Sequence, residues 1–174
     1  MTVGIHLDRA LPDDPDLDAL DCGVAEVDRY FRSRVWFDDR KGRASPATYQ
    51  CRTGPGGLVV GYAAAAFRNQ AHPTDDGFER ARYLVLYALG VHRQFQGVRN
   101  PADRGRSHAA TILVALEEMG RQRSDCVGLS LWVREDNARA LAFYGRCGFV
   151  ADPAGPVARD GGPRHLTLRL LFDR

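Results

Sequence analysis

The sequence has little lysine, no two cysteines with CxxC spacing and no long apolar run. Lys41 is the only lysine, so arginine supplies nearly all the positive charge in a chain whose formal net charge is +2. A net charge that small does not by itself predict nucleic-acid binding. Arginine suits bidentate contact with phosphate, but the codon usage of a GC-rich genome is the simpler explanation for so much arginine.

The four cysteines form no CxxC pair and have no metal-ligand spacing with the five histidines. Isolated cysteines of this kind are usually small buried residues. The N-terminal residues lack the apolar segment of a signal peptide, and no apolar run is long enough to cross a bilayer. The sequence therefore predicts a cytoplasmic protein with reduced thiols, without a metal and without membrane association.

The length of 174 residues fits one domain, residues 1–174, and no linker-like stretch divides it. The spacing of apolar residues predicts helices over 24–36, 107–120 and 137–148. Strands are predicted over 3–7, 47–52, 58–67, 83–91, 127–133, 149–151 and 165–172, with a polar loop over 68–79 and a turn-rich stretch over 153–164. This order of elements predicts a single α/β or α+β domain.

A loop rich in glycine and arginine follows the apolar strand 83–91 and leads into the second helix. That helix begins near Ser107, which suits an N-cap, and the N–H groups of a helix start bind anions well. Gly97 and Gly105 let the backbone approach a ligand. Positive charge comes from Arg99, Arg104 and Arg106. These features suit a pyrophosphate group, although an ordinary surface loop also contains glycine and arginine.

Two segments resemble the hallmarks of the GNAT (GCN5-related N-acetyltransferase) superfamily. The loop and helix start are similar to its coenzyme A motif, Arg/Gln-x-x-Gly-x-Gly/Ala, although Ser107 replaces the middle glycine and residues 99–106 split the motif. Residues 137–149 are similar to Asn-x-x-Ala-x-x-x-Tyr-x-x-x-Gly-Phe, also after a strand. The resemblance implies a mixed, mostly antiparallel central sheet flanked by helices, and acetyl-CoA as the co-substrate that donates the acetyl group.

The resemblance also implies which residues bind coenzyme A: Leu89, Gly90, Val91, Gln96, Gly97, Arg104, Gly105, Arg106, Ser107, His108, Ala109, Asn137 and Tyr144. Backbone N–H groups at 89–91 would hold the acetyl carbonyl. Tyr144 would be the catalytic residue, because a phenol held close to the sulfur can protonate the leaving thiolate. Without the resemblance, Asn137 is as well explained as an N-cap and Tyr144 as a core aromatic.

The sequence does not identify a general base. Each candidate is also explained as a solvated loop residue, and the candidates are His72, Asp75, Asp76, Glu79 and His92.

The acceptor amine is left open among three hypotheses. The first is an amine of a small molecule or peptide. The second follows from a looser resemblance of residues 21–31, 38–41, 58–62 and 95–97 to GNAT-type toxins. It implies aminoacyl-tRNA as substrate, a small DNA-binding antitoxin as partner and a basic stripe starting at residues 29–43. The third is a non-catalytic module that binds acetyl-CoA. By analogy with other GNAT proteins, a homodimer through the last strands is also expected.

Overall fold

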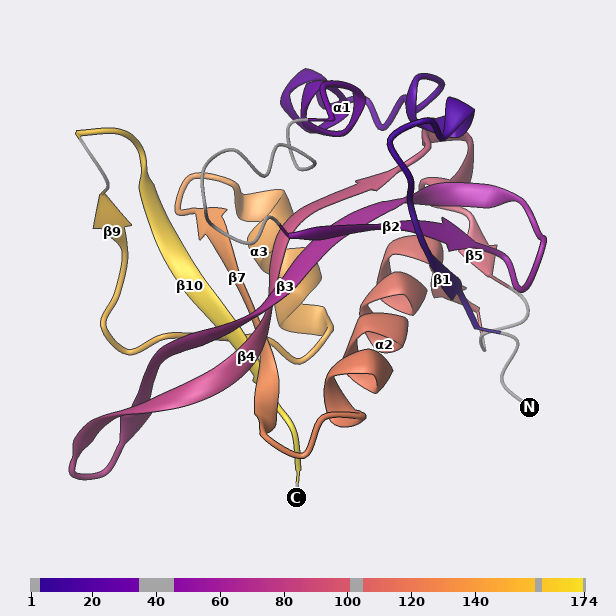
Figure 1. The fold of residues 1–174 in the computed structure, drawn as a ribbon. Helices are drawn as coiled ribbons and strands as arrows, with labels where there is room; N and C mark the ends of the chain where they lie inside the picture. Colours follow the sequence, from indigo (N-terminus) through magenta and orange to yellow (C-terminus); the bar gives the residue numbers. More distant parts are fainter. Residues whose placement is uncertain (1–3, 35–45, 101–104, 159–160, 174) are drawn as a thin grey trace. The chain divides into compact units, whose positions relative to one another are not determined.

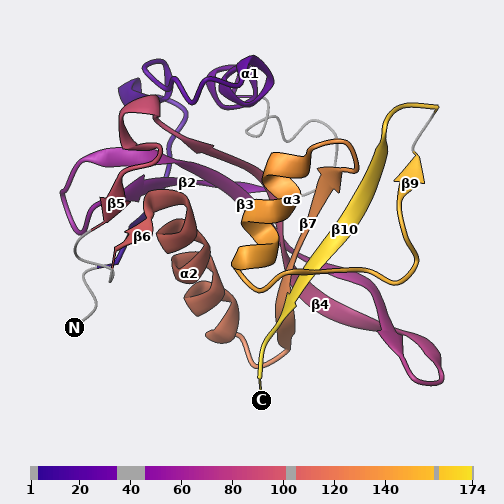
Figure 2. The ribbon, with the colours of Figure 1, turned by 180° about the vertical axis from the view of Figure 1, so that it is seen from behind.

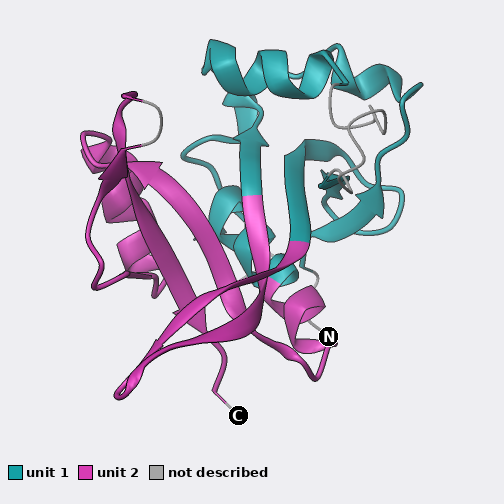
Figure 3. Ribbon diagram, turned by 60° about the vertical axis from the view of Figure 1, so that its left-hand side comes forward, with its two compact units in different colours: residues 1–66, 87–116 teal, residues 67–86, 117–174 magenta. Residues whose placement is uncertain are grey.

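A computed structural model of the chain describes residues 4–34, 46–100, 105–158 and 161–173. The chain divides into two compact units, and Figure 3 colours them separately. Unit 1 comprises residues 1–66 and 87–116, and unit 2 comprises residues 67–86 and 117–174. Three elements contribute residues to both units, namely β3 (Val59–Thr74), β4 (Gly77–Val91) and α2 (His108–Arg121).

Unit 1 contains antiparallel strands, and residues of η1 and α1 pack against them. Its own elements are β1 (His6–Arg9), the 3-10 helix η1 (Pro15–Leu17), α1 (Ala25–Arg32), β2 (Ala47–Arg52), the 3-10 helix η4 (Arg93–Phe95), β5 (Arg99–Asn100) and β6 (Arg106–Ser107). β2 pairs with β1 on one side and with β3 on the other, both antiparallel (Figure 1). Leu17, Leu20 and Phe31 pack against Tyr62 of β3 in a buried cluster. Burial of these side chains is the main stabilising contribution in unit 1.

Unit 2 contains the only parallel strand pair that the structure describes. Its own elements are β7 (Cys126–Arg134), α3 (Ala138–Arg146), β8 (Val150–Ala151), β9 (Val157–Ala158) and β10 (Arg164–Leu171). β7 pairs parallel with β4, as at Leu84 and Leu129, and antiparallel with β10. β8 and β9 both pair antiparallel with β10. α3 covers one face of β7 and β10, as the opposite views of Figures 1 and 2 show.

A mixed, mostly antiparallel sheet with three α-helices in the described residues confirms the expected architecture. Most of the predicted elements lie within one or two residues of the observed ones, and 47–52 matches β2 at both ends.

The predicted loop over 68–79 is wrong, because β3 and β4 extend through it as a hairpin. Only the turn at Asp75 and Asp76 is irregular, followed by Gly77 with φ of +133°. The outer residues of this hairpin, Gly77 to Arg80, are exposed. A strand pair exposed in this way satisfies its backbone within the ladder and tolerates polar side chains, so its polar composition resembles that of a loop.

Three other boundaries differ from the prediction. The first helix ends at Arg32 instead of reaching residue 36, because the Ser33 hydroxyl donates to the Tyr30 carbonyl and Arg34 has a left-handed φ of 55°. The first strand runs from His6 to Arg9 rather than over 3–7. The turn-rich stretch 153–164 contains β9.

Candidate functional site

The predicted carbonyl-binding residues lie together at the end of β4 in unit 1. Leu89 is half-buried, and Gly90 and Val91 are buried. A Cβ added to Gly90 would lie 3.2 Å from Cγ1 of Val27 in α1, within the core of unit 1. Tight packing on that side of β4 therefore favours glycine at this position, whatever its role towards a ligand.

The loop after β4 is held by side-chain hydrogen bonds. The Gln96 amide donates to the carbonyls of Cys22, at 2.6 Å, and of Val91, at 2.8 Å. Arg93 Nε donates to Asp21 Oδ1 at 2.9 Å. Gly97 follows with φ of +73°, a conformation that favours glycine, and it is exposed. The Gln96 side chain thus positions the loop, and its predicted contact with coenzyme A stays a prediction.

The segment that splits the first motif forms a small hairpin that ends at α2. β5 pairs antiparallel with β6, Arg99 opposite Ser107 and Asn100 opposite Arg106. Gly105, with φ of +74°, donates its N–H to the Asn100 carbonyl at 3.1 Å. Arg104, a predicted coenzyme contact, lies outside the described residues.

The start of α2 combines an N-cap with a buried histidine. The Ser107 hydroxyl accepts the N–H of Ala110 at 3.3 Å, as expected of an N-cap. His108 is only 5% exposed, and its ring packs on Phe95 with 5.3 Å between the ring centroids. Its Nδ1 is buried and has no hydrogen-bond partner among the described residues. Ala109 is half-buried.

The second predicted motif places Asn137 and Tyr144 on α3 in unit 2. Asn137 caps the helix, since its Oδ1 accepts the N–H of Ala140 at 3.1 Å. Tyr144 is half-buried, with its ring edge-on to Phe143 at 5.1 Å and to Phe149 at 5.5 Å between centroids. None of the described residues forms a hydrogen bond with its hydroxyl.

Burial raises the pKa of Tyr144 to about 12, with a smaller contribution from nearby Cys147. Desolvation disfavours the phenolate, so the phenol keeps its proton at neutral and mildly alkaline pH. The side chain is therefore a proton donor and not a base.

His92 is the candidate base in unit 1. It is half-buried, burial lowers its pKa, and its Nδ1 accepts the N–H of Asp21 at 3.4 Å. In the neutral ring that accepts at Nδ1, Nε2 carries the proton, so this ring is a donor rather than a base. His92 also lines a cavity of about 880 Å³ in unit 1 with Asp16, Arg52 and Arg93. Sequence patterns do not predict this cavity, because its walls come from segments far apart in the chain.

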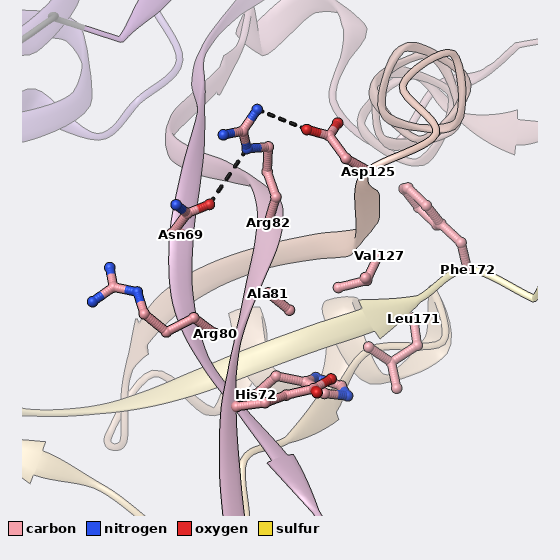
Figure 4. Close-up of a pocket in the computed structure, with 10 residues that line it drawn as sticks. Asn69, His72, Arg80, Ala81, Arg82, Asp125, Val127, Leu171 and Phe172 are labelled. Carbon is pink, nitrogen blue, oxygen red and sulfur yellow. Dashed lines mark hydrogen bonds and ion pairs between the residues drawn. The ribbon is translucent and has the colours of Figure 1, made fainter.

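The other candidate bases belong to the β3–β4 hairpin in unit 2. His72 and Glu79 line a second cavity, of about 560 Å³. Arg82 and Asp125 also line it, and the Arg82 guanidinium donates to the Asp125 carboxylate at 2.8 Å (Figure 4). His72 Nδ1 is hydrogen-bonded to the Tyr83 hydroxyl. Asp75 and Asp76 form the exposed turn. His72 is tied to Tyr83, the two aspartates form a turn and Glu79 is exposed, so the geometry does not single out a base.

The described part of the chain contains no group of three or more histidine, cysteine, aspartate or glutamate residues placed to hold a metal ion. Of the helices described, none is long and apolar enough to cross a membrane. All four cysteines are free thiols; Cys22, Cys51 and Cys126 are buried, and Cys147 is half-buried.

Sequence comparison decides the family. Residues 16–149 match the acetyltransferase (GNAT) family, which is more than half of the chain. The chain belongs to this family. No curated protein sequence matches it. The two helix starts described above, at Ser107 and Asn137, are thus those of a GNAT protein.

Solved structures of GNAT proteins share the fold at low sequence identity. The toxin AtaT complexed with acetyl-methionyl-tRNAfMet has a TM-score of 0.62 at 18% identity, covering 97% of this chain and 94% of that one. The KacTA–DNA complex has a TM-score of 0.62 at 15% identity, covering 96% of this chain and 92% of that one. NAA60 from Arabidopsis thaliana, in complex with a bisubstrate analogue, has a TM-score of 0.61 at 14% identity, covering 97% and 99%.

Proposed function

We propose that the protein is an acetyl-CoA-dependent N-acetyltransferase that acetylates a primary amine of a small molecule or peptide. Its family membership supports this proposal. The observation that carries it is the state of Tyr144: the phenol is protonated, half-buried and not hydrogen-bonded to any described residue. A proton donor without another task, in the second GNAT motif, suits a reaction that releases a thiolate.

The residues of unit 1 fit an anionic, diphosphate-bearing donor. Exposed Gly97 has open space where a Cβ would lie, the 14-residue helix α2 begins with its partial positive charge at His108, and Arg106 is exposed. The unpartnered Nδ1 of His108 adds a polar atom that a ligand would satisfy. In the proposal, residues 97–100 and 105–109 hold the diphosphate and Leu89–Val91 hold the acetyl carbonyl.

Acetyl-CoA supplies the acetyl group as an activated thioester. In the proposed reaction, backbone N–H groups at Leu89–Val91 donate to the acetyl oxygen while a neutral amine attacks the carbonyl carbon. The carbon–sulfur bond breaks, Tyr144 gives its proton to the sulfur, and the amine loses a proton to solvent, from which the phenolate is reprotonated. A phenol of pKa about 12 is a weaker acid than a thiol of about 8.5, so this proton moves only when Tyr144 is held against the sulfur.

The test incubates the protein with acetyl-CoA and a set of acceptors: small primary amines, peptides with a free N-terminus, and charged tRNA. The expected result is thiol release that depends on the acceptor, with an acetylated amine found by mass spectrometry. Binding of acetyl-CoA without acceptor-dependent release from any of them would overturn the proposal in favour of the non-catalytic module.

Aminoacyl-tRNA is the second candidate acceptor, because toxin structures, one of them bound to acetyl-methionyl-tRNA, match nearly the whole chain. The antitoxin would be a further partner in that case. In the described part of residues 29–43, however, Arg32 donates to the Leu20 carbonyl and Arg34 pairs with Asp18 at 2.8 Å. Two of the arginines expected in a basic stripe are therefore bonded within unit 1.

A salt series distinguishes the two acceptors. Because phosphate contacts release counterions, the KM for charged tRNA should rise steeply with salt, whereas the KM for a peptide should not. A charged tRNA whose α-amine is already acetylated is the matched control, since it keeps the phosphates and lacks the acceptor.

A further inference from the structure

His108 is a buried histidine with an unexplained polar atom. The residue is 5% exposed, and its Nδ1 is buried without a partner in the described residues. Leaving such a group unsatisfied costs about 1–3 kcal/mol, and buried polar side-chain atoms in proteins are nearly always hydrogen-bonded. An apolar ring at this position would avoid the cost of an unsatisfied polar atom. The presence of histidine therefore indicates a hydrogen-bond partner for Nδ1 that the described residues do not supply.

The surroundings of His108 indicate what kind of partner fits. It is the first residue of α2, whose N-terminus carries a partial positive charge and attracts anions. The Phe95 ring packs against the His108 ring with 5.3 Å between the centroids. The group that satisfies Nδ1 would therefore lie beside a helix start, where an anionic oxygen is favoured over a neutral one.

Ser107 occupies one of the backbone N–H groups at the start of α2, which leaves fewer hydrogen-bond donors for a bound anion. Its hydroxyl accepts the N–H of Ala110, so one of the first amides of α2 is already bonded within the chain. The family motif has a glycine at the position of Ser107, and a glycine offers no hydroxyl to bond that amide. An imidazole N–H from the next residue offsets the lost donor.

We propose that His108 Nδ1–H donates a hydrogen bond to a diphosphate oxygen of coenzyme A bound at the start of α2. This inference rests on the proposed function, since it assigns one more ligand atom to the same donor site. It requires the tautomer with its proton on Nδ1 and does not require a charged ring. His108 is then a binding residue specific to this chain, acting through its side chain.

Three substitutions separate this role from packing. His108→Phe keeps a ring against Phe95 and removes both nitrogens. His108→Asn places an amide nitrogen near the position of Nδ1, and His108→Gln places it near that of Nε2. Calorimetry of each variant with coenzyme A, which has the diphosphate, and with pantetheine, which has no phosphate, measures the contribution of the diphosphate contact. Thermal unfolding of each ligand-free variant measures stability.

The affinity of His108→Phe and His108→Gln for coenzyme A should fall roughly 10- to 100-fold, as for a hydrogen bond to a charged group. His108→Asn should retain most of the affinity, and pantetheine should bind all four proteins equally. The ligand-free Phe variant should unfold at the same temperature as the wild type or higher.

Equal coenzyme A affinity in the wild type and His108→Phe would overturn the inference, as would an equal loss of pantetheine affinity or a failure of Asn to exceed Gln. If His108→Phe does not fold, the Asn and Gln pair decides alone. A wild type that binds neither acetyl-CoA nor coenzyme A would overturn the proposed function itself, which is a separate result.

Discussion

The half-buried ring of Tyr144 contacts two aromatic rings, and burial raises the pKa of its phenol so that it keeps its proton. The sequence predicted the position of this residue on a helix after a strand, and it predicted the N-caps at Ser107 and Asn137. It did not predict that Gln96 bonds to Cys22, 74 residues away, because nothing local in the chain encodes that contact. Caps depend on neighbouring residues, whereas such a tether depends on the whole fold.

The pKa of Tyr144 gives a prediction for the pH dependence. Its pKa is raised to about 12, so the acid form persists through neutral and mildly alkaline pH and is lost only as pH rises through the raised value. With an amine acceptor, kcat/KM should rise with pH as the amine loses its proton and then level off, without falling below about pH 10. A pH profile with a descending limb centred near pH 8–9 would contradict the assignment of Tyr144 as the acid.

At the scale of elements, the start of α2 is the part of the donor site that one substitution tests best. Ala109→Glu places a carboxylate beside the proposed diphosphate, and like charges repel. A carboxylate in the first turn of a helix is itself favourable, so stability should be retained. We expect coenzyme A affinity to fall at least about tenfold with little change in the melting temperature, and the neutral Ala109→Gln to bind nearly as the wild type does. Unchanged affinity in calorimetry would remove the site from α2.

The strands of unit 2 are joined by a buried ion pair that the sequence did not reveal. Arg169 of β10 lies 2.7 Å from Asp152 after β8 and donates to the Tyr83 hydroxyl of β4 at 3.0 Å. The side chains of Arg169 and Asp152 are 11% and 7% exposed. The sequence does not predict this pair, because a turn-rich stretch separates β8 from β10 and neither residue lies in a recognisable motif.

Breaking this pair should destabilise the protein strongly. Asp152→Ala leaves a buried guanidinium without its carboxylate, which typically costs about 3–5 kcal/mol. The double variant with Arg169→Met should recover most of that loss, since no buried charge remains. Urea denaturation measures both, with Asp136→Ala in the exposed Arg134–Asp136 pair as a control of small effect. An Asp152→Ala variant as stable as the wild type would show that the pair contributes no stability.

At the scale of the whole molecule, the sequence patterns did not predict the β3–β4 hairpin or the division into two units. The 3.6- and 2-residue periods located the helices and the buried strands, because burial of one face imposes them. The exposed outer part of β3 and β4 is not subject to that constraint, so its polar residues resembled a loop. Gly77 was the one local signal of the hairpin turn.

We propose that the chain unfolds as one domain even though it forms two compact units. β3, β4 and α2 belong to both units, so unfolding of one unit removes part of three elements from the other. In a Trp36→Phe variant, fluorescence of Trp132 in unit 2 and far-UV circular dichroism of the whole chain should therefore give coincident denaturation curves. Two separated transitions would show instead that the units are independent domains.

The proposed chemistry is a property of the whole molecule, because one turnover requires both binding of acetyl-CoA and protonation of its sulfur. The measurement that tests it most directly is single-turnover acetyl transfer by Tyr144→Phe, with the half-buried Tyr49→Phe in β2 as the matched control. The account predicts a rate about 10²- to 10⁴-fold lower for Tyr144→Phe at saturating acetyl-CoA, with Tyr49→Phe fully active. A Tyr144→Phe variant that binds acetyl-CoA and transfers the acetyl group at the wild-type rate would contradict it.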